Sequence, residues 1–247
     1  MRLVLLTYCL LLSLFSFGIS NSKFHEGNDA YSHQEYALAL EKYSQLVSEG
    51  YHSAELYYNL GNTHYQLSEI GKAIWSYEKA LEIDPSFEDA RFNLDFVNML
   101  TVDQIDQDKG GLGSWFKGIF FSQSINFWAY MSALMSILLA ISLVLFFRSR
   151  QRKLKNLSML LGSVFGLLLL FTLLTAHFHK GYIQDQSNGI IIVESTAVRL
   201  SPLEEAQLSF ELHEGSKVQI IGSNAEWVEV EVNENTGWML KEDLWEI

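Results

Sequence analysis

Hydrophobic residues follow three patterns along the chain, and each pattern predicts a different kind of structure. Uncharged apolar runs cover residues 3–19, 127–147 and 157–178. Between the first two runs, small and aromatic residues recur with a period of 34 residues, which indicates a helical repeat. After residue 188, hydrophobic residues alternate with a period of two, which is typical of strands. The pattern predicts a multidomain membrane protein: an all-α helical repeat, a transmembrane helical hairpin and an all-β domain.

The two later apolar runs are long enough to cross a bilayer, because a spanning helix needs about 20 apolar residues. They predict transmembrane helices at residues 125–147 and 157–178, joined by a basic loop at 148–156. The alternative, a buried hairpin of a soluble domain, does not suit runs of this length and this content of Leu, Ile and Phe. Positively charged loops stay in the cytoplasm. We therefore expect the domains before and after the hairpin on the exoplasmic, or periplasmic, side.

The first apolar run follows Arg2 and ends at small residues, as in a signal peptide covering residues 1–20. Two alternatives stay open. One is an uncleaved anchor helix, and the other is a lipoprotein signal, which the central position of Cys9 in the run makes weaker. Residues 101–124 are interpreted as a linker with an interfacial segment, because Trp and Phe residues gather at 115–121 before the first membrane helix.

Small residues predict where the two membrane helices meet. In each helix they recur every four residues, which places them on one helical face. The first stripe is Ser132, Ser136 and Ala140, and the second is Ser158, Gly162 and Gly166. Close packing through small residues favours helix association in lipid. In an antiparallel hairpin the two stripes overlap best around Ala140, Gly162 and Gly166. The spacing could also arise by chance, or one stripe could join two copies of the chain.

The 34-residue period rests on matching positions in the region before the hairpin. Gly27 and Tyr31 recur as Gly61 and Tyr65, and Tyr43 recurs as Tyr77. Residues 54–87 resemble the tetratricopeptide repeat (TPR), and the matching positions are Tyr57, Leu60, Gly61, Tyr65, Ala73, Tyr77, Ala80 and Pro85.

This resemblance implies a TPR domain at residues 23–100. The repeats cover about 20–53 and 54–87, and residues 88–100 form a polar capping helix. The residues expected to hold the repeats together are Gly27, Gly61, Ala73, Tyr77, Ala80 and Pro85.

TPR domains take peptides or helices on a concave face, so the resemblance also implies a partner-binding groove. By the repeat register it is lined by Phe24, Asn28, Tyr31, Tyr58, Asn62, Tyr65 and Gln66. The alternative for the tyrosines is that they only pack against the neighbouring helix. Some TPR domains clamp a carboxylate with Asn and basic residues. Here Asn28 and Asn59 match the asparagines, but the cation positions hold Phe24, Asp89 and Asn93. An acidic, aromatic groove suits a basic or mixed segment better.

The period-two region at residues 188–247 predicts a small barrel of about five strands. Its motifs resemble the bacterial SH3-like (SH3b) family, with Gly215 at a tight turn and Trp238 expected in the core. Such domains bind peptides, in some proteins those of the cell wall. The plainer interpretation is an interaction module whose ligand is unknown.

Charge and composition narrow the function. The 247 residues carry 17 Lys/Arg and 29 Asp/Glu, a net charge of −12. Residues 23–124 hold 7 Lys/Arg against 16 Asp/Glu, and residues 178–247 hold 4 against 13, so both domains are acidic. Nucleic acid is an unsuitable partner for such a chain. With 49% hydrophobic residues the chain is not disordered, and one cysteine excludes a disulfide framework and a Cys-ligated zinc site.

No motif for catalysis stands out. The sequence contains no HExxH, no phosphate loop and no nucleophile elbow. His177 and His179 have no Cys or acidic neighbour, and the acidic run at 103–111 departs from the calcium-loop spacing. We therefore expect no catalytic residue, no metal and no cofactor.

The order of the parts resembles the BatE-like family of Bat aerotolerance-operon proteins over essentially the whole chain. This resemblance implies a bacterial inner-membrane protein encoded with von Willebrand factor A-domain Bat proteins and a MoxR-type ATPase, its partners in an aerotolerance or stress complex. Two hypotheses follow. The chain is a membrane-anchored scaffold whose TPR groove docks a partner, or it binds or senses peptidoglycan through the SH3-like domain.

Overall fold

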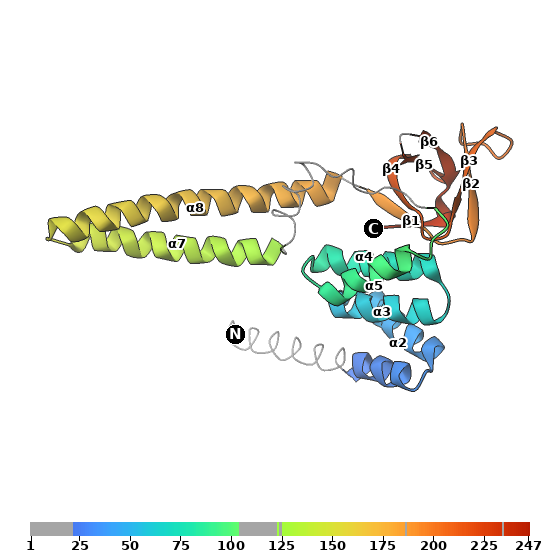
Figure 1. Cartoon of the computed structure of the whole chain (residues 1–247), viewed down its shortest axis with the longest axis horizontal. Helices are drawn as coiled ribbons and strands as arrows, with labels where there is room; N and C mark the ends of the chain where they lie inside the picture. Colours follow the sequence, from blue (N-terminus) through green and yellow to red (C-terminus); the bar gives the residue numbers. More distant parts are fainter. Residues whose placement is uncertain (1–21, 104–122, 124, 186, 234) are drawn as a thin grey trace, which may run out of the picture. The chain divides into compact units, whose positions relative to one another are not determined.

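The computed structural model describes residues 22–103, 123, 125–185, 187–233 and 235–247. The chain divides into two compact units (Figure 1). The first unit combines residues 1–107 with residues 187–247, so segments from both sides of the apolar hairpin belong to it. The second unit is residues 108–186. The predicted signal peptide, and the predicted linker apart from residues 101–103 and 123, lie outside the described residues.

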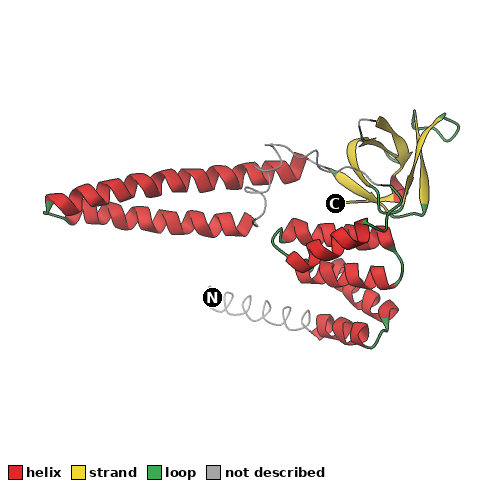
Figure 2. Cartoon of the chain, viewed as in Figure 1, coloured by secondary structure: helices red, strands yellow, loops and turns green. Residues whose placement is uncertain are grey.

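The first part of unit 1 is a stack of helices (Figures 1 and 2). A helix at residues 22–32 is followed by α2 (Tyr36–Ser48), α3 (Ala54–Gln66), α4 (Ile70–Ile83) and α5 (Glu88–Asn98). The 34-residue period holds in the backbone: α2 and α4 begin 34 residues apart, and so do α3 and α5. The turns repeat as well, since Gln34 and Ser68 both adopt positive φ, at 65° and 63°.

Local sequence explains where these helices begin. Ser53 precedes α3, and its hydroxyl accepts a hydrogen bond from the Leu56 N–H at 3.1 Å, which satisfies one of the free donors of the first turn. The first turn of α5 carries Glu88 and Asp89, which suit the positive end of the helix dipole. The buried core between the repeats is aromatic and aliphatic: Ala30, Ala39, Tyr43, Leu46, Leu56, Tyr57, Leu60, Ala80 and Ala90.

Residues 188–246 form one antiparallel sheet of seven strands, more than the roughly five expected. The strands are β1 (Asn188–Ile191), β2 (Ser195–Arg199), β3 (Leu208–His213), β4 (Lys217–Ser223), β5 (Trp227–Val232), β6 (Asn235–Leu240) and β7 (Leu244–Glu246). Their order in the sheet is β3-β2-β6-β5-β4-β1-β7, so β3 and β7 are edges and the sheet is open. The backbone hydrogen bonds therefore form an open sheet, not the closed barrel that was predicted.

The alternation of apolar and polar residues along each strand determines which side chains form the core of this sheet. Val228, Val230 and Val232 alternate along β5, and all three are buried. The same alternation buries Met239 fully and Trp238 only in part, so Trp238 is not in the buried core where it was expected. Gly215 lies in the turn between β3 and β4, as predicted. Its φ of +88° is a conformation that glycine adopts readily.

The sheet packs against the helices α4 and α5 within unit 1. Ile190 of β1 is buried in one cluster with Ile74, Tyr77, Leu94 and Val97, and the final residue Ile247 packs at its edge. A repeat array normally ends in a helix with a polar outer face. Here the sheet also packs on the last two helices, so β1 covers apolar residues of α4 and α5 next to the predicted capping helix at 88–100.

Unit 2 contains two antiparallel helices, α7 (Ile125–Arg148) and α8 (Arg152–Asp185). Both contain spans long and apolar enough to cross a membrane, at Asn126–Arg148 and Arg152–Ala176. Only 11% of an apolar 18-residue window in each span is buried within the structure, whereas the core helix of a soluble protein is mostly buried. The helices take in most of the predicted loop, since α8 begins at Arg152 and the connection is three residues long.

Candidate functional site

Helices 22–32, α3 and α5 occupy equivalent places in successive repeats, so their side chains recur in rows. One row is Phe24, Tyr58 and Phe92, and the next is Asn28, Asn62 and Phe96. A third is Tyr31, Tyr65 and Met99. We call the surface formed by these rows and Gln66 the A-helix face. It contains all seven residues predicted for the groove and extends them by three.

The predicted asparagines hold the repeats together. The carbonyl oxygen of Asn28 accepts hydrogen bonds from the Tyr43 hydroxyl at 2.7 Å and from the Asn59 amide at 2.9 Å. The same arrangement recurs 34 residues later around Asn62, which accepts from Tyr77 at 2.8 Å and from Asn93 at 2.8 Å. Each asparagine oxygen therefore serves the contact between repeats.

Burial of these tyrosines has an electrostatic consequence. Loss of solvation raises the pKa of Tyr43 to about 12, and it raises the pKa of Tyr77 further. Both hydroxyls therefore remain protonated donors at neutral pH. The glycines opposite them fit this packing, since a Cβ at Gly27 or at Gly61 would lie 2.5 Å from the ring of Tyr43 or Tyr77.

The other predicted repeat residues are buried or lie in a turn. Ala73 and Ala80 have no exposed surface. Pro85 follows the end of α4, where its carbonyl accepts a hydrogen bond from Arg91 at 2.7 Å.

The predicted groove tyrosines are only partly available. The ring of Tyr58 packs 5.0 Å from Phe87 and 6.1 Å from Tyr77, measured between ring centroids. Tyr65 meets Phe96 edge-on at 6.0 Å, and Tyr31 meets Tyr36 in the same way at 5.4 Å. All three tyrosines are half-buried. Packing against a neighbouring helix, the alternative that the sequence left open, therefore accounts for much of their surface.

The most exposed apolar residues of the A-helix face were not predicted. Phe92 is 72% exposed, Phe96 is 45% exposed and Met99 is 76% exposed. Adding 34 to Tyr58, Asn62 and Tyr65 gives these positions, so the repeat register contained the signal. The register was not extended to α5 because a polar cap was expected there. Phe92, Phe96 and Met99 show that this side of α5 is apolar.

Charges in the helical region are unevenly satisfied. Residues 22–103 carry five Lys/Arg and 14 Asp/Glu. Every one of the five cations is engaged within these residues: four pair with carboxylates and Arg91 binds the Pro85 carbonyl. A carbonyl does not neutralise a guanidinium, so Arg91 keeps its positive charge, but carboxylates outnumber cations in these residues by nine.

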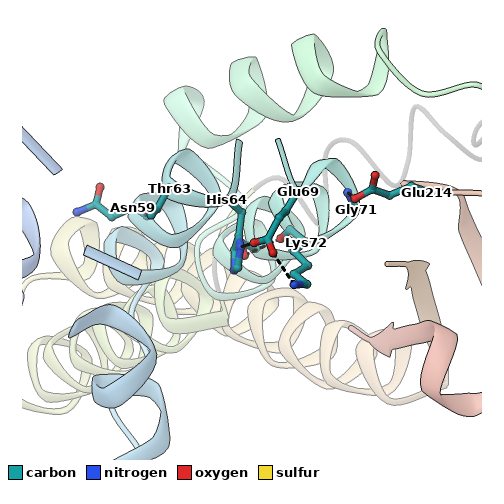
Figure 3. A network of polar contacts seen from close by, with 8 residues as sticks. Asn59, Thr63, His64, Glu69, Gly71, Lys72 and Glu214 are labelled. Atoms are coloured by element: carbon teal, nitrogen blue, oxygen red, sulfur yellow. Dashed lines mark hydrogen bonds and ion pairs between the residues drawn. The ribbon is translucent and has the colours of Figure 1, made fainter. Parts of the chain in front are cut away.

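A second polar site lies where the sheet meets α4 (Figure 3). The carboxylate of Glu69 accepts hydrogen bonds from His64 at 2.6 Å and from Lys72 at 2.8 Å. The ring of Trp245, in β7, lies edge-on to His64, with 6.3 Å between centroids. Glu214, at the β3–β4 turn, accepts a hydrogen bond from the N–H of Gly71. We call this contact between the sheet and α4 the junction. The sequence did not predict its residues as functional, because their contacts join segments far apart in the chain.

Burial sets the protonation of this site. It lowers the pKa of His64, and the neighbouring carboxylate only partly offsets the effect. For Glu69, burial would raise the pKa, but hydrogen bonds from Lys72 and His64 together outweigh it, so the pKa is lowered. Both lowered pKa values are consistent with a neutral His64 that donates from Nδ1 to the ionised carboxylate of Glu69.

Further polar contacts tie the sheet to the helices. Asp103 accepts hydrogen bonds from the Ser216 hydroxyl at 2.6 Å and from the His213 N–H at 2.7 Å. Lys217 pairs with Glu78 at 2.7 Å. The chemistry of the junction is that of a structural contact, and within the described residues no group of three His, Cys, Asp or Glu side chains is arranged to hold a metal.

The two helices of unit 2 meet mainly through hydroxyl residues. Ser132 donates to Thr172 at 3.1 Å, and Ser142 donates to the backbone oxygen of Ser158. Gly162 lies on this contact, since an added Cβ would be 3.2 Å from the Ser142 hydroxyl. A Cβ at Gly166 would meet nothing within 4 Å, and Ala140 is exposed. Ser132, Ser158 and Gly162 of the predicted stripes therefore lie at this contact, whereas Ala140 and Gly166, where the stripes were expected to overlap best, do not.

Comparison with known families finds one match. Residues 54–87, which are α3, α4 and the turn after them, match the model of the tetratricopeptide repeat family. A comparison with curated proteins finds no match. The matched segment contains the glycine, alanine and tyrosine contacts described above. Residues 54–87 are therefore similar to a tetratricopeptide repeat, a family that serves as a protein-interaction module.

Proposed function

We propose that this chain is a membrane-anchored scaffold that docks a protein partner on its A-helix face. The observation that carries the proposal is the group of exposed apolar residues along α5 and at its end. Phe92 and Met99 are each more than 70% exposed. A contiguous apolar surface of this kind marks an interaction site more often than isolated exposed residues do. The residues belong to the same rows as the predicted groove, so the surface continues from one repeat to the next.

The hairpin α7–α8 is the membrane anchor in this proposal. Its basic connection, from Arg148 to Lys155, is placed in the cytoplasm by the positive-inside rule. Two spans return the chain to the side from which it started. That topology supports the contacts inside unit 1, because they require residues before and after the hairpin to share one side of the membrane.

The finer assignments rest on the order of the parts. Each of the seven strands or their ends gives a residue to one buried core, which supports a strongly curved sheet of SH3-like type despite its open edges. With the helical repeat and the hairpin, this order supports a BatE-like protein of the bacterial inner membrane. Its partners would then include von Willebrand factor A-domain Bat proteins and a MoxR-type ATPase system, in an aerotolerance or stress complex.

Site-specific photocrosslinking tests the docking proposal. We would place p-benzoylphenylalanine at Phe92, or at Leu38 as a control, in the full chain in its native membranes. Leu38 is also exposed (39%) but lies on α2, outside the A-helix face. A defined protein adduct is expected from position 92, absent from position 38, and lost with Met99→Ser. Equal adducts from both positions would show that the face is not the docking site.

A further inference from the structure

The exposed residues of α5 lie on one side of the helix. Phe92, Phe96 and Met99 are spaced by four and three residues, so they form a single stripe about two turns long. Leu100 and Val102, 50% and 71% exposed, extend the apolar surface beyond the end of the helix. A stripe with this spacing matches the i, i+4, i+7 anchors with which one amphipathic helix packs against another.

Carboxylates border the stripe. Glu88 precedes Phe92 by four residues and Asp95 precedes Met99 by four, so both lie on the same side of α5 as the stripe, and both are exposed. The five cations of residues 22–103 are already engaged within the helical region, as described above. A partner therefore meets an apolar stripe with a negative margin.

The polar groups of the A-helix face argue against an extended peptide. Such a ligand needs free amide groups to bind its backbone. The carbonyl oxygens of Asn28 and Asn62 are used between the repeats, and the third row position is Phe96 rather than asparagine. Recognition on this face depends on apolar contact and on charge.

From these observations we infer the class of partner, and the inference rests on the proposed function. The A-helix face takes a cationic amphipathic α-helix, with large apolar residues on one side and Lys or Arg at the margins. The apolar side covers Phe92, Phe96 and Met99, while the cations meet Glu88 and Asp95. An anionic bilayer surface does not suit the same stripe, because it would repel these carboxylates.

Binding of designed peptides to the full chain tests the inference. The chain would be held in phosphatidylcholine nanodiscs, and empty nanodiscs would give the background. The probe is a synthetic peptide of about 18 residues, made of Leu and Lys with the Leu side chains on one helical face. One control peptide replaces every Lys with Glu. A second keeps the composition but scrambles the order, so that charge remains and the apolar face is lost.

We expect the amphipathic Leu/Lys peptide to bind more tightly than both controls. Phe92→Ser with Met99→Ser should weaken it at least about ten-fold, since truncated anchor residues at an interface centre commonly have such effects. Glu88→Gln with Asp95→Asn should weaken it and reduce its salt dependence. Leu38→Ser should leave the affinity unchanged. Equal binding of the scrambled or Glu peptide, or no effect of the double serine variant, would refute the inference.

Two further outcomes separate the possibilities. If position 92 gives a native protein adduct but the Leu/Lys peptide does not bind, the docking function stands and the class of partner is wrong. A bimane probe on Met99→Cys, in a Cys9→Ser background, reports on the bilayer. Strong quenching of this probe by spin-labelled lipid would place the stripe on the membrane and overturn the inference.

Discussion

The carboxylate of Glu214 accepts a hydrogen bond from the backbone N–H of Gly71 at 2.8 Å, although 143 positions separate the two residues. Gly71 lies in the first turn of α4, where backbone donors have no partner inside the helix. No side chain next to α4 caps it, so a residue from the sheet supplies the acceptor and a negative charge at the positive end of the helix. The sheet thus completes a helix that precedes the hairpin in sequence.

Removing this cap should weaken the junction. Glu214→Ala should lower the free energy of unfolding of unit 1 by about 1 kcal/mol, the usual cost of losing an N-terminal cap. Glu214→Gln keeps an acceptor oxygen and should cost less. Glu204→Ala, at an exposed loop position, is the matched control. Thermal unfolding of the full chain, followed by tryptophan fluorescence, measures the effect, and equal midpoints for Glu214→Ala and Glu204→Ala would exclude a stabilising cap.

A methyl group at Gly71 should separate the sheet from the helices. A Cβ there would lie 2.2 Å from the backbone oxygen of Ile191, which cannot move as a flexible side chain can. Gly71→Ala should therefore destabilise unit 1 by about 1–3 kcal/mol, as overpacking does in well-packed cores. Hydrogen exchange should speed up in α4 and β1. Gly166→Ala meets no neighbouring atom and should change neither measurement. Unchanged exchange in Gly71→Ala would show that the junction is looser than the structure has it.

Acid should weaken the junction through His64. Because burial lowers the pKa of His64 below its unfolded value, the unfolded chain binds the proton more readily. Stability is therefore present above about pH 6.5 and is lost as the pH falls from there toward the folded pKa. His64→Gln does not titrate, so its midpoint should change less than that of the wild type between about pH 7.5 and 5.5. Exposed His25→Gln should behave as wild type.

Further acidification should act on two carboxylates. The pKa of Asp103 is lowered because hydrogen bonds from Ser216 and His213 outweigh the effect of burial, and the pKa of Glu69 is lowered by Lys72 and His64. Stability from such groups is present above their unfolded pKa values, near pH 4, and is lost below. An identical pH dependence of the wild type and His64→Gln above about pH 5 would contradict the assignment to His64.

Tyr58 and Phe92 should separate folding from binding. Tyr58→Ala removes a half-buried ring that contacts Phe87 and Tyr77, and we expect it to cost about 2–4 kcal/mol of stability. Phe92→Ala removes a ring that is 72% exposed and should cost less than about 0.5 kcal/mol. Urea unfolding of both variants checks this. A larger loss for Phe92→Ala would mean that its ring is a structural contact.

The hairpin contact gives a further prediction. Gly162→Ile should push α7 and α8 apart because the added side chain meets Ser142, whereas Gly166→Ile points into open space. Oxidative crosslinking between Ser132→Cys and Thr172→Cys, in a Cys9→Ser background, should fall only in the first variant. Equal loss in both variants would favour the stripe predicted from sequence.

The proposed membrane topology is tested by thiol labelling. In intact spheroplasts, an impermeant thiol reagent should label Ser44→Cys and Ser223→Cys but not Ser149→Cys.

Much of the fold could be predicted because it is local. The 34-residue spacing placed the boundaries of the repeats within a few residues, and the uncharged runs placed both long helices. The sheet was predicted in kind but not in strand number, because β1 and β7 are short and gain their hydrogen bonds from strands distant in sequence. The contact face of the hairpin was predicted only in part: Ser132, Ser158 and Gly162 lie on it but Gly166 does not, because helical spacing does not fix the rotation of a long apolar helix.

The candidate site divides in the same way. The rows of the A-helix face follow from the period, and extending it once more would have reached Phe92. The junction could not have been predicted, since nothing in the sequence around Gly71 or Asp103 indicates a partner more than 100 positions away. Such contacts depend on how two folded surfaces fit.

The nitrogen of the Trp75 ring donates to the backbone oxygen of Glu246 at 2.8 Å, a bond between α4 and β7. In a growing polypeptide, Glu246 is made only after α7 and α8 have left the ribosome. Until then, Ile74 and Val97 of the helical repeats lack the cover that Ile190 of β1 gives them in the folded chain. A copy whose synthesis stops before β1 keeps this apolar surface open. Burial of that surface thus reports that translation has passed the hairpin.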